Sequence, residues 1–173
     1  MDDTVTFCFH GIGTPGRDLE PDEDGYWVRT DRFHRILDHL AERSGPRITF
    51  DDGNASDAEI ALPALTERGL TATFFILAGR LDTPGSLTSA AVAELRRAGM
   101  TIGTHGMNHR IWRGMTPQTR QVELIDARDR IAEAAGAAVD EAACPLGGYD
   151  RRLLNDLRGL GYTRVHTSSP APC

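Results

Sequence analysis

Two short clusters contain the residues whose types and spacing could do chemistry. The first is Asp51-Asp52, followed by Gly53, and the second pairs His105 with His109. Adjacent carboxylates repel each other and lose hydration when buried, so such a pair commonly serves a cation or acid–base chemistry. The ordinary alternatives are a polar turn in which one aspartate caps a helix, and two loop histidines exposed to solvent.

Together the two clusters predict a metal site. His105 and His109 share one face if the turn between them is helical, the spacing used by two-histidine zinc sites. No glutamate follows His105, which excludes the H-E-x-x-H motif of zinc proteases. One carboxylate and two imidazoles leave a coordination position open, as a catalytic zinc or similar divalent ion requires. The second carboxylate of Asp51-Asp52 is then free to act as a general base.

Strands and helices alternate along the chain and must position these clusters. Short β-rich apolar runs predict strands at 5–9, 47–50, 71–77, 100–104, 141–144 and 163–167. Apolar residues at helical spacing predict helices at 31–42, 89–98, 116–136 and 149–160. This alternation predicts βαβ units and a parallel sheet, either open or closed into a barrel. Both clusters then lie at the carboxyl ends of strands.

Composition excludes several other functions. All 19 basic side chains are arginine, so the chain has no Schiff-base lysine and no phosphate loop. A net charge of −6 argues against a nucleic-acid partner. No run of about 18 apolar residues is present, which argues against a membrane span. A length of 173 residues predicts a single domain over 1–173.

Other short motifs carry weaker signals. Residues 11–16 match G-x-G-x-x-G, but no helical pattern follows, so we interpret them as a turn at the start of an irregular loop over 13–25. The first residues lack the pattern of a signal peptide, which predicts a cytoplasmic protein. Cys8, Cys144 and Cys173 form no Cys-x-x-Cys pair and fit reduced thiols.

Three motifs resemble those of a known family. Thr49-Phe50-Asp51-Asp52-Gly53, His105-x-x-x-His109 and the segment 145–150 (Pro-Leu-Gly-Gly-Tyr-Asp) resemble the polysaccharide deacetylases, the NodB-homology domain of carbohydrate esterase family 4. The resemblance extends over roughly 47–169. It implies an α/β fold, an irregular and incompletely closed (β/α) barrel of about six to seven strands. It also implies removal of acetyl groups, mostly N-acetyl groups of amino sugars, with a bound divalent metal.

The resemblance assigns a role to each matching residue. Asp51 is expected to be the catalytic base that activates a water on the metal, with Zn²⁺ preferred over Co²⁺, Ni²⁺ or Mn²⁺. The backbone N–H of Leu146 is expected to stabilise the oxyanion. The expected metal ligands are Asp52, His105 and His109. The residues expected to contact substrate are Pro145, Gly147, Tyr149 and Trp112, and Tyr26 and Trp27 are further aromatic candidates for stacking on a sugar.

Three positions depart from the family pattern. Gly106 stands where a serine or threonine usually follows the first histidine, and Ala143 stands where an arginine usually orients the base; Arg113 is a weak candidate to replace that arginine. The C-terminal Leu-x-His that supplies the general acid is absent. The acid is therefore expected from His10, from His166, or from substrate or water, unless the chain is truncated.

The resulting hypothesis is a metal-dependent hydrolase that deacetylates an intracellular amino sugar or saccharide. Two alternatives remain open. One is a degenerate, non-hydrolytic metal-containing domain that binds saccharides, and the other is an amidase that acts on a non-sugar amide. Beyond the acetylated saccharide, the sequence predicts no partner and leaves the oligomeric state undetermined.

Overall fold

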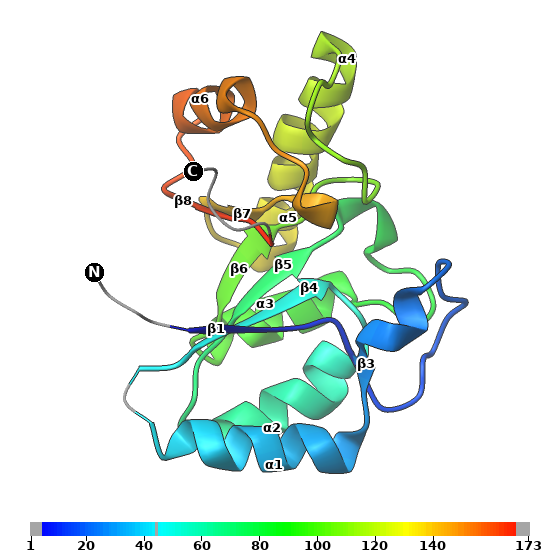
Figure 1. The fold of residues 1–173 in the computed structure, drawn as a ribbon, viewed down its shortest axis with the longest axis vertical. Coiled ribbons are helices and arrows are strands. Elements are labelled where there is room, and N and C mark those ends of the chain that lie inside the picture. Colours follow the sequence, from blue (N-terminus) through cyan, green and yellow to red (C-terminus); the bar gives the residue numbers. More distant parts are fainter. Residues whose placement is uncertain (1–4, 44, 169–173) are drawn as a thin grey trace.

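Six parallel strands form the centre of the structure, a computed structural model that describes residues 5–43 and 45–168. In spatial order they are β1 (Thr6–Phe9), β4 (Arg47–Asp52), β5 (Thr73–Ile76), β6 (Thr101–Thr104), β7 (Glu141–Ala143) and β8 (Arg164–His166). The sheet curls into a half-barrel, and helices cover its outer side (Figure 1). The predicted fold class, an incompletely closed (β/α) barrel, is confirmed.

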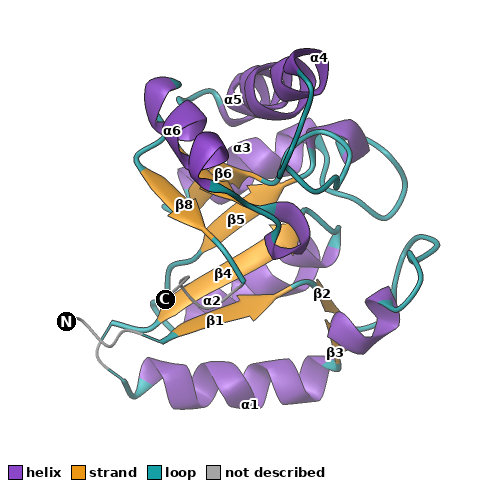
Figure 2. Cartoon of the chain, turned by 45° about the horizontal axis from the view of Figure 1, so that its top comes forward, coloured by secondary structure: helices purple, strands orange, loops and turns teal. Residues whose placement is uncertain are grey.

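Figure 2 shows the helices packed around the sheet. The α-helices are α1 (Thr30–Ala41), α2 (Leu62–Glu67), α3 (Ser89–Arg97), α4 (Pro117–Arg120), α5 (Ala127–Ala135) and α6 (Arg151–Gly159). Two π-helical segments, η2 (Asp57–Ala61) and η4 (Gln121–Asp126), precede α2 and α5. Short 3-10 turns are η1 (Glu23–Tyr26), η3 (Ala78–Arg80) and η5 (Pro145–Gly147).

Alternation along each strand separates the core from the interior of the half-barrel. Neighbouring strand residues point to opposite faces, so Phe50 and Phe74 lie on the outer face while Asp51 and Phe75 lie on the inner one. The rings of Phe50 and Phe74 stack at 4.6 Å between centroids, and Phe33 of α1 packs edge-on against Phe50. A second apolar cluster joins α6 to the strands β7 and β8. The outer face is therefore the core, and the inner face is available for polar side chains.

All six predicted strands are present, with one change that matters for the site. β4 continues through Asp52 instead of ending at Phe50. The helix predicted at 116–136 is continuous from α4 through η4 to α5, with Thr116 Oγ1 capping it and Gly136 ending it at φ 62°. The sequence patterns missed the helical stretch of η2 and α2 and the short parallel pair β2 (Gly11–Ile12) and β3 (Trp27–Val28).

Two further expectations can be compared with the structure. No dinucleotide-type helix follows residues 11–16, but the segment is not wholly a turn, because Gly11 and Ile12 form β2 and the chain bends only from Gly13, which has φ 75°. Cys8 and Cys144 are free thiols, and Cys173 lies outside the described residues. No helix in the described part of the chain is long and apolar enough to cross a membrane.

Candidate metal centre and active site

Asp52 places an unpartnered carboxylate oxygen at the carboxyl end of β4. The residue is only 2% exposed, and its Oδ1 has no hydrogen-bond partner among the described residues. Its backbone adopts φ 79°, the left-handed region, which turns the side chain out of the alternation of the strand. This turn is how the adjacent Asp51 and Asp52 can both face the same end of the half-barrel.

His105 and His109 direct their Nε2 atoms toward that same oxygen. The distances from Asp52 Oδ1 are 3.7 Å to His105 Nε2 and 3.6 Å to His109 Nε2. The turn between the histidines is not helical, contrary to the geometry assumed from their spacing, because Gly106 (φ 87°) and His109 (φ 53°) both adopt left-handed backbone. A tight loop therefore brings the two rings to 5.3 Å between centroids.

The other nitrogen of each ring has a partner that orients it. His105 Nδ1 lies 2.9 Å from the carbonyl oxygen of Ala143, and only a donating N–H suits that contact. Burial lowers the pKa of His105 to about 4, so the ring is neutral and its Nε2 presents a lone pair. His109 Nδ1 lies 3.1 Å from Glu20 Oε2, and Arg80 pairs with the other oxygen of Glu20. Such partners fix the orientation and tautomer of metal-binding histidines.

These three side chains fit a divalent metal ion. Ligand atoms about 2.0–2.2 Å from a tetrahedral ion lie about 3.3–3.6 Å apart. The observed separations of 3.6 and 3.7 Å approach this range. A buried carboxylate oxygen with no donor nearby is costly unless a cation neutralises it, which is a second and independent reason for the fit.

Asp51 lies beside this ligand set on the inner face of β4. The pKa of Asp51 is raised to about 7, mainly by burial and secondly by the negative charge of Asp52. A contact with the Cys8 thiol lowers the pKa of Asp51 and offsets part of this rise. Desolvation of the Cys8 thiol and the nearby Asp51 charge raise the pKa of that thiol to about 12, so it remains an S–H donor. Asp51 therefore has the environment of a carboxylate able to take a proton.

Glu123 of the π-helical segment η4 holds the histidine loop in place. It is 1% exposed and accepts hydrogen bonds from the backbone N–H groups of Met107 (2.7 Å) and Asn108 (3.2 Å), and from the amide of Asn108 (3.1 Å). A Cβ at Gly106 would lie 2.6 Å from Glu123 Oε2. Glycine at this position is therefore required by the close approach of Glu123 as well as by its φ of 87°.

Restoring the usual hydroxyl by Gly106→Ser is expected to damage the site. The new side chain must move Glu123 and adopt a strained backbone, so we expect a loss of about 1–3 kcal/mol in the free energy of unfolding and weaker zinc binding. Urea denaturation and a zinc competition assay measure the two effects. Gly114→Ser is the matched control, because Gly114 has φ 73° with no atom within 4 Å of a built Cβ. Equal losses in the two variants would contradict the steric argument.

Leu146 occupies the turn after β7 with strained backbone geometry. Its φ is 55°, and its side chain is 65% exposed. The turn is closed by hydrogen bonds from Gly147 N–H to Cys144 O (3.1 Å) and from Gly148 N–H to Pro145 O (3.2 Å). Within 5–43 and 45–168, the Leu146 N–H has no hydrogen-bond partner. An exposed backbone donor held in this way suits an oxyanion.

The two candidate acids lie in different surroundings. His10 follows β1 beside Asp51, with one ligand-type atom of each residue within 4.8 Å of the other, and its ring lies 4.9 Å from that of Tyr26. Desolvation lowers the pKa of His10. His166 contacts the ring of Phe75 at 4.7 Å, and its Nε2 lies 3.4 Å from Glu141 Oε2. The structure thus brings His10, and not His166, next to the predicted base.

The residues expected to contact substrate differ in how exposed they are. Trp112 is 1% exposed and packs in the second apolar cluster, so its ring has no face available to a sugar. Pro145 and Gly147 are also buried, and Tyr149 packs partly against the same cluster. Tyr26, in contrast, is 64% exposed. Tyr26, one of the aromatic candidates from the sequence and the last residue of η1, therefore has a ring available at this edge.

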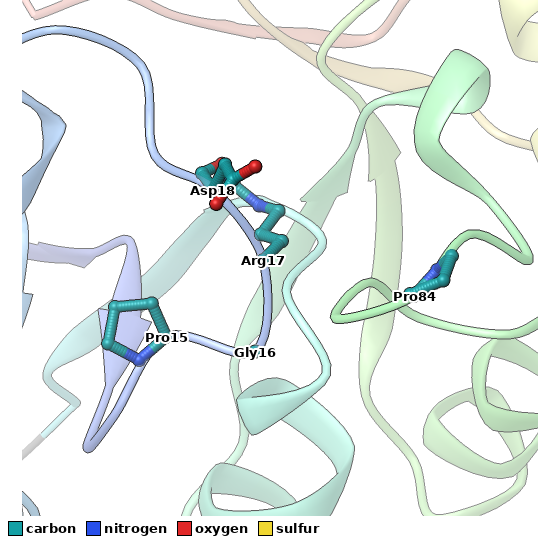
Figure 3. A pocket seen from close by; sticks show the side chains of 5 residues that line it. All are labelled: Pro15, Gly16, Arg17, Asp18 and Pro84. Carbon is teal, nitrogen blue, oxygen red and sulfur yellow. The ribbon is translucent and has the colours of Figure 1, made fainter.

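A surface hollow of about 530 Å³ lies along the same loop. Figure 3 shows Gly16 and Arg17 on one side and Pro84 on the other, and Pro15 and Asp18 complete the lining. Arg17 Nε donates to Asn54 Oδ1 at 3.0 Å, and Asn54 directly follows Gly53. The hollow therefore borders the segment after β4 but contains none of the three candidate ligands.

The comparison with known protein families decides the relationship. The polysaccharide deacetylase family model matches residues 42–165. The chain belongs to the polysaccharide deacetylase family. Its match to the Bacillus subtilis protein named putative polysaccharide deacetylase YxkH is 28% identical over 123 residues and covers 71% of this chain. The match covers 44% of YxkH, so the chain spans about half the length of such relatives.

Solved structures with the same fold include two bacterial deacetylases. The deacetylase PplD from Streptococcus pyogenes, solved with acetate, superposes with a TM-score of 0.77 at 20% identity, covering 92% of this chain and 80% of PplD. The polysaccharide deacetylase BC0361 from Bacillus cereus gives a TM-score of 0.82 at 18% identity, covering 97% of this chain and 58% of BC0361.

One feature of this polysaccharide deacetylase family member follows from its Ala143. In the described residues no arginine forms an ion pair with Asp51, and the weak candidate Arg113 is exposed. The Ala143 backbone carbonyl orients His105, and the Cys8 thiol lies near Asp51, with its sulfur within 4.8 Å of a carboxylate oxygen. Cys8 and Glu20 are the contacts that the sequence motifs did not identify.

Proposed function

We propose that this protein is a metal-dependent hydrolase that removes the N-acetyl group of an amino sugar. The observation that supports the proposal is the buried, unpartnered Oδ1 of Asp52, which faces two imidazole nitrogens at 3.6 and 3.7 Å beside a second carboxylate, Asp51. Membership of the polysaccharide deacetylase family connects this arrangement with deacetylation.

Zn²⁺ is the proposed ion, held by Asp52, His105 and His109. Two nitrogens and one oxygen with an open position suit zinc, and Co²⁺, Ni²⁺ or Mn²⁺ are the expected substitutes. When bound, such an ion supplies Lewis acidity that polarises the acetyl carbonyl and makes the attacking water more acidic.

The residues of the chain supply the remaining steps. Asp51 takes a proton from the water that attacks the acetyl carbonyl, and the Leu146 N–H donates a hydrogen bond to the developing oxyanion. His10, in its protonated form, then donates a proton to the departing amine of the sugar, and the proton taken by Asp51 passes to solvent. Tyr26, exposed and adjacent to His10, is positioned to stack on a sugar ring.

Acetate release tests the proposed function. The metal-free protein is incubated with N-acetylglucosamine oligomers before and after addition of one equivalent of Zn²⁺ or Co²⁺, and acetate and free amine are measured. We expect both products only with metal. Tight metal binding without release from sugar or simple amide substrates favours the non-hydrolytic alternative, and release from simple amides alone favours the amidase.

His10→Ala is expected to lower turnover of N-acetyl sugars by about 10²-fold or more with metal affinity retained, because the amine then leaves without its proton donor. An activated acetyl ester, whose leaving group needs no protonation, should be hydrolysed at nearly the normal rate by the same variant. His166→Ala tests the other candidate acid. A loss on sugar substrates that appears only in His166→Ala would reverse the assignment.

A further inference from the structure

A second group of potential metal ligands lies beside the first. Cys8 and His10 come from β1 and its end, and Asp51 comes from β4. The parallel register pairs Cys8 with Thr49 and Phe9 with Phe50, so Cys8, His10, Thr49 and Asp51 share the inner face. The Asp52, His105 and His109 set uses none of these three residues.

The three donor atoms are close enough to converge on one ion. One ligand atom from each of Cys8, His10 and Asp51 lies within 4.8 Å of the other two. A tetrahedral zinc with sulfur at about 2.3 Å and nitrogen or oxygen at about 2.0–2.2 Å needs separations of about 3.3–3.7 Å. The atoms must therefore approach each other by at most about 1.5 Å, which side-chain rotation can supply at an edge strand where Cys8 is exposed.

The chemistry of this second set differs from that of the first. It contains a sulfur ligand, and thiolate favours Zn²⁺, Cd²⁺ or Cu⁺ over magnesium and calcium. Cys8 is an exposed residue, whereas Asp52 and His105 of the first set are each 2% exposed.

We propose that a second metal cation, Zn²⁺ or another ion that favours thiolate, binds Cys8, His10 and Asp51 and inhibits the enzyme. As the metal–sulfur bond forms, the Cys8 S–H bond breaks and its proton passes to solvent, with no change in oxidation state. Coordination occupies the lone pairs that Asp51 needs to accept a proton and that His10 needs to carry one. The second metal site does not depend on the proposed deacetylase function. Inhibition by the second cation does rest on that function.

Cobalt titration tests the site without any substrate. We expect the metal-free protein to bind two equivalents of Co²⁺, the second with a thiolate-to-cobalt charge-transfer band in the near ultraviolet. Cys8→Ser should bind one equivalent and lack the band. Its second-site affinity should fall by more than about 100-fold, since loss of even an outer partner of a ligand commonly costs about 10–100-fold. Cys144→Ala and Cys173→Ala, which remove the other thiols, should keep both features.

Zinc titration of activity tests the consequence. Wild-type activity is expected to rise to one equivalent of Zn²⁺ and to fall in excess. In Cys8→Ser the fall in excess Zn²⁺, measured relative to the activity of that variant at one equivalent, should be absent. A single equivalent bound by wild type, or a band that persists in Cys8→Ser, would overturn the second site. A protein that binds two equivalents with the Cys8-dependent band but never releases acetate would keep the site and reject the proposed function.

Discussion

Replacing Asp51 with asparagine is expected to lower kcat for deacetylation by about 10²- to 10⁴-fold while one equivalent of metal remains bound. The amide keeps the size of the side chain but cannot take a proton from water. Asp51 is not among the three side chains that converge on the first site, so its charge is not needed to hold the ion there. The expected result is therefore a protein that is loaded with metal and nearly inactive.

Acetate release at saturating substrate, together with metal content by atomic absorption, measures this outcome. Asp38→Asn is the matched control, because Asp38 is exposed on α1 and pairs with Arg68, away from the inner face. A variant at Asp51 that retains activity within tenfold of wild type would contradict its role as the base. Loss of metal in Asp51→Asn would instead assign that carboxylate to the ligand set.

Asp52→Asn and His109→Ala are each expected to weaken zinc binding by more than about 100-fold, since each removes a direct ligand. The Asp52 variant has a second expected effect. Without metal, its unfolding temperature should equal or exceed that of wild type, because a buried carboxylate without a partner is removed. Added Zn²⁺ should raise the unfolding temperature of wild type more than that of the variant, which keeps only the second proposed site.

Competition with a fluorescent chelator and thermal unfolding with and without Zn²⁺ measure these effects. His34→Ala, on helix α1, is the matched histidine control and should bind zinc as wild type does. A variant of His109 that still holds zinc tightly would contradict its place among the ligands. A lower unfolding temperature in metal-free Asp52→Asn would show that the carboxylate has a stabilising partner.

The strands and their carboxyl ends could be predicted from the sequence because they depend on local patterns. Apolar runs such as 47–50 and 100–104 identify strands, and parallel strands bring their carboxyl ends to one edge, so Asp52 and His105 had to lie near each other. The helical stretch of η2 and α2 was missed, because its apolar residues directly follow the Asp-Asp-Gly turn and Pro63 interrupts the pattern.

Local conformation within the motifs was only partly predictable. The four-residue spacing of the histidines suggested a helical turn, whereas the structure forms a loop in which Gly106 and His109 both have positive φ. The reason lies outside the motif, in Glu123, whose carboxylate binds the loop backbone from a helix. The burial of Trp112 was likewise not predictable from its own segment, because Trp112 packs in a cluster with residues of α6.

The sequence by itself determined the chemistry of the candidate ligands and base. The chain is acidic, its basic side chains are all arginine, and the carboxylates and imidazoles that could bind a metal stand at predicted strand ends, at Asp51, Asp52, His105 and His109. Tertiary structure alone decided which groups orient those donors. Glu20 contacts His109 across 89 residues of chain, and Cys8 reaches Asp51 from a different strand. The periodicity of a strand is encoded by neighbouring residues. The contact of Glu20 depends instead on how a long loop folds, and that of Cys8 depends on strand register, and both are set by the packing of the whole chain.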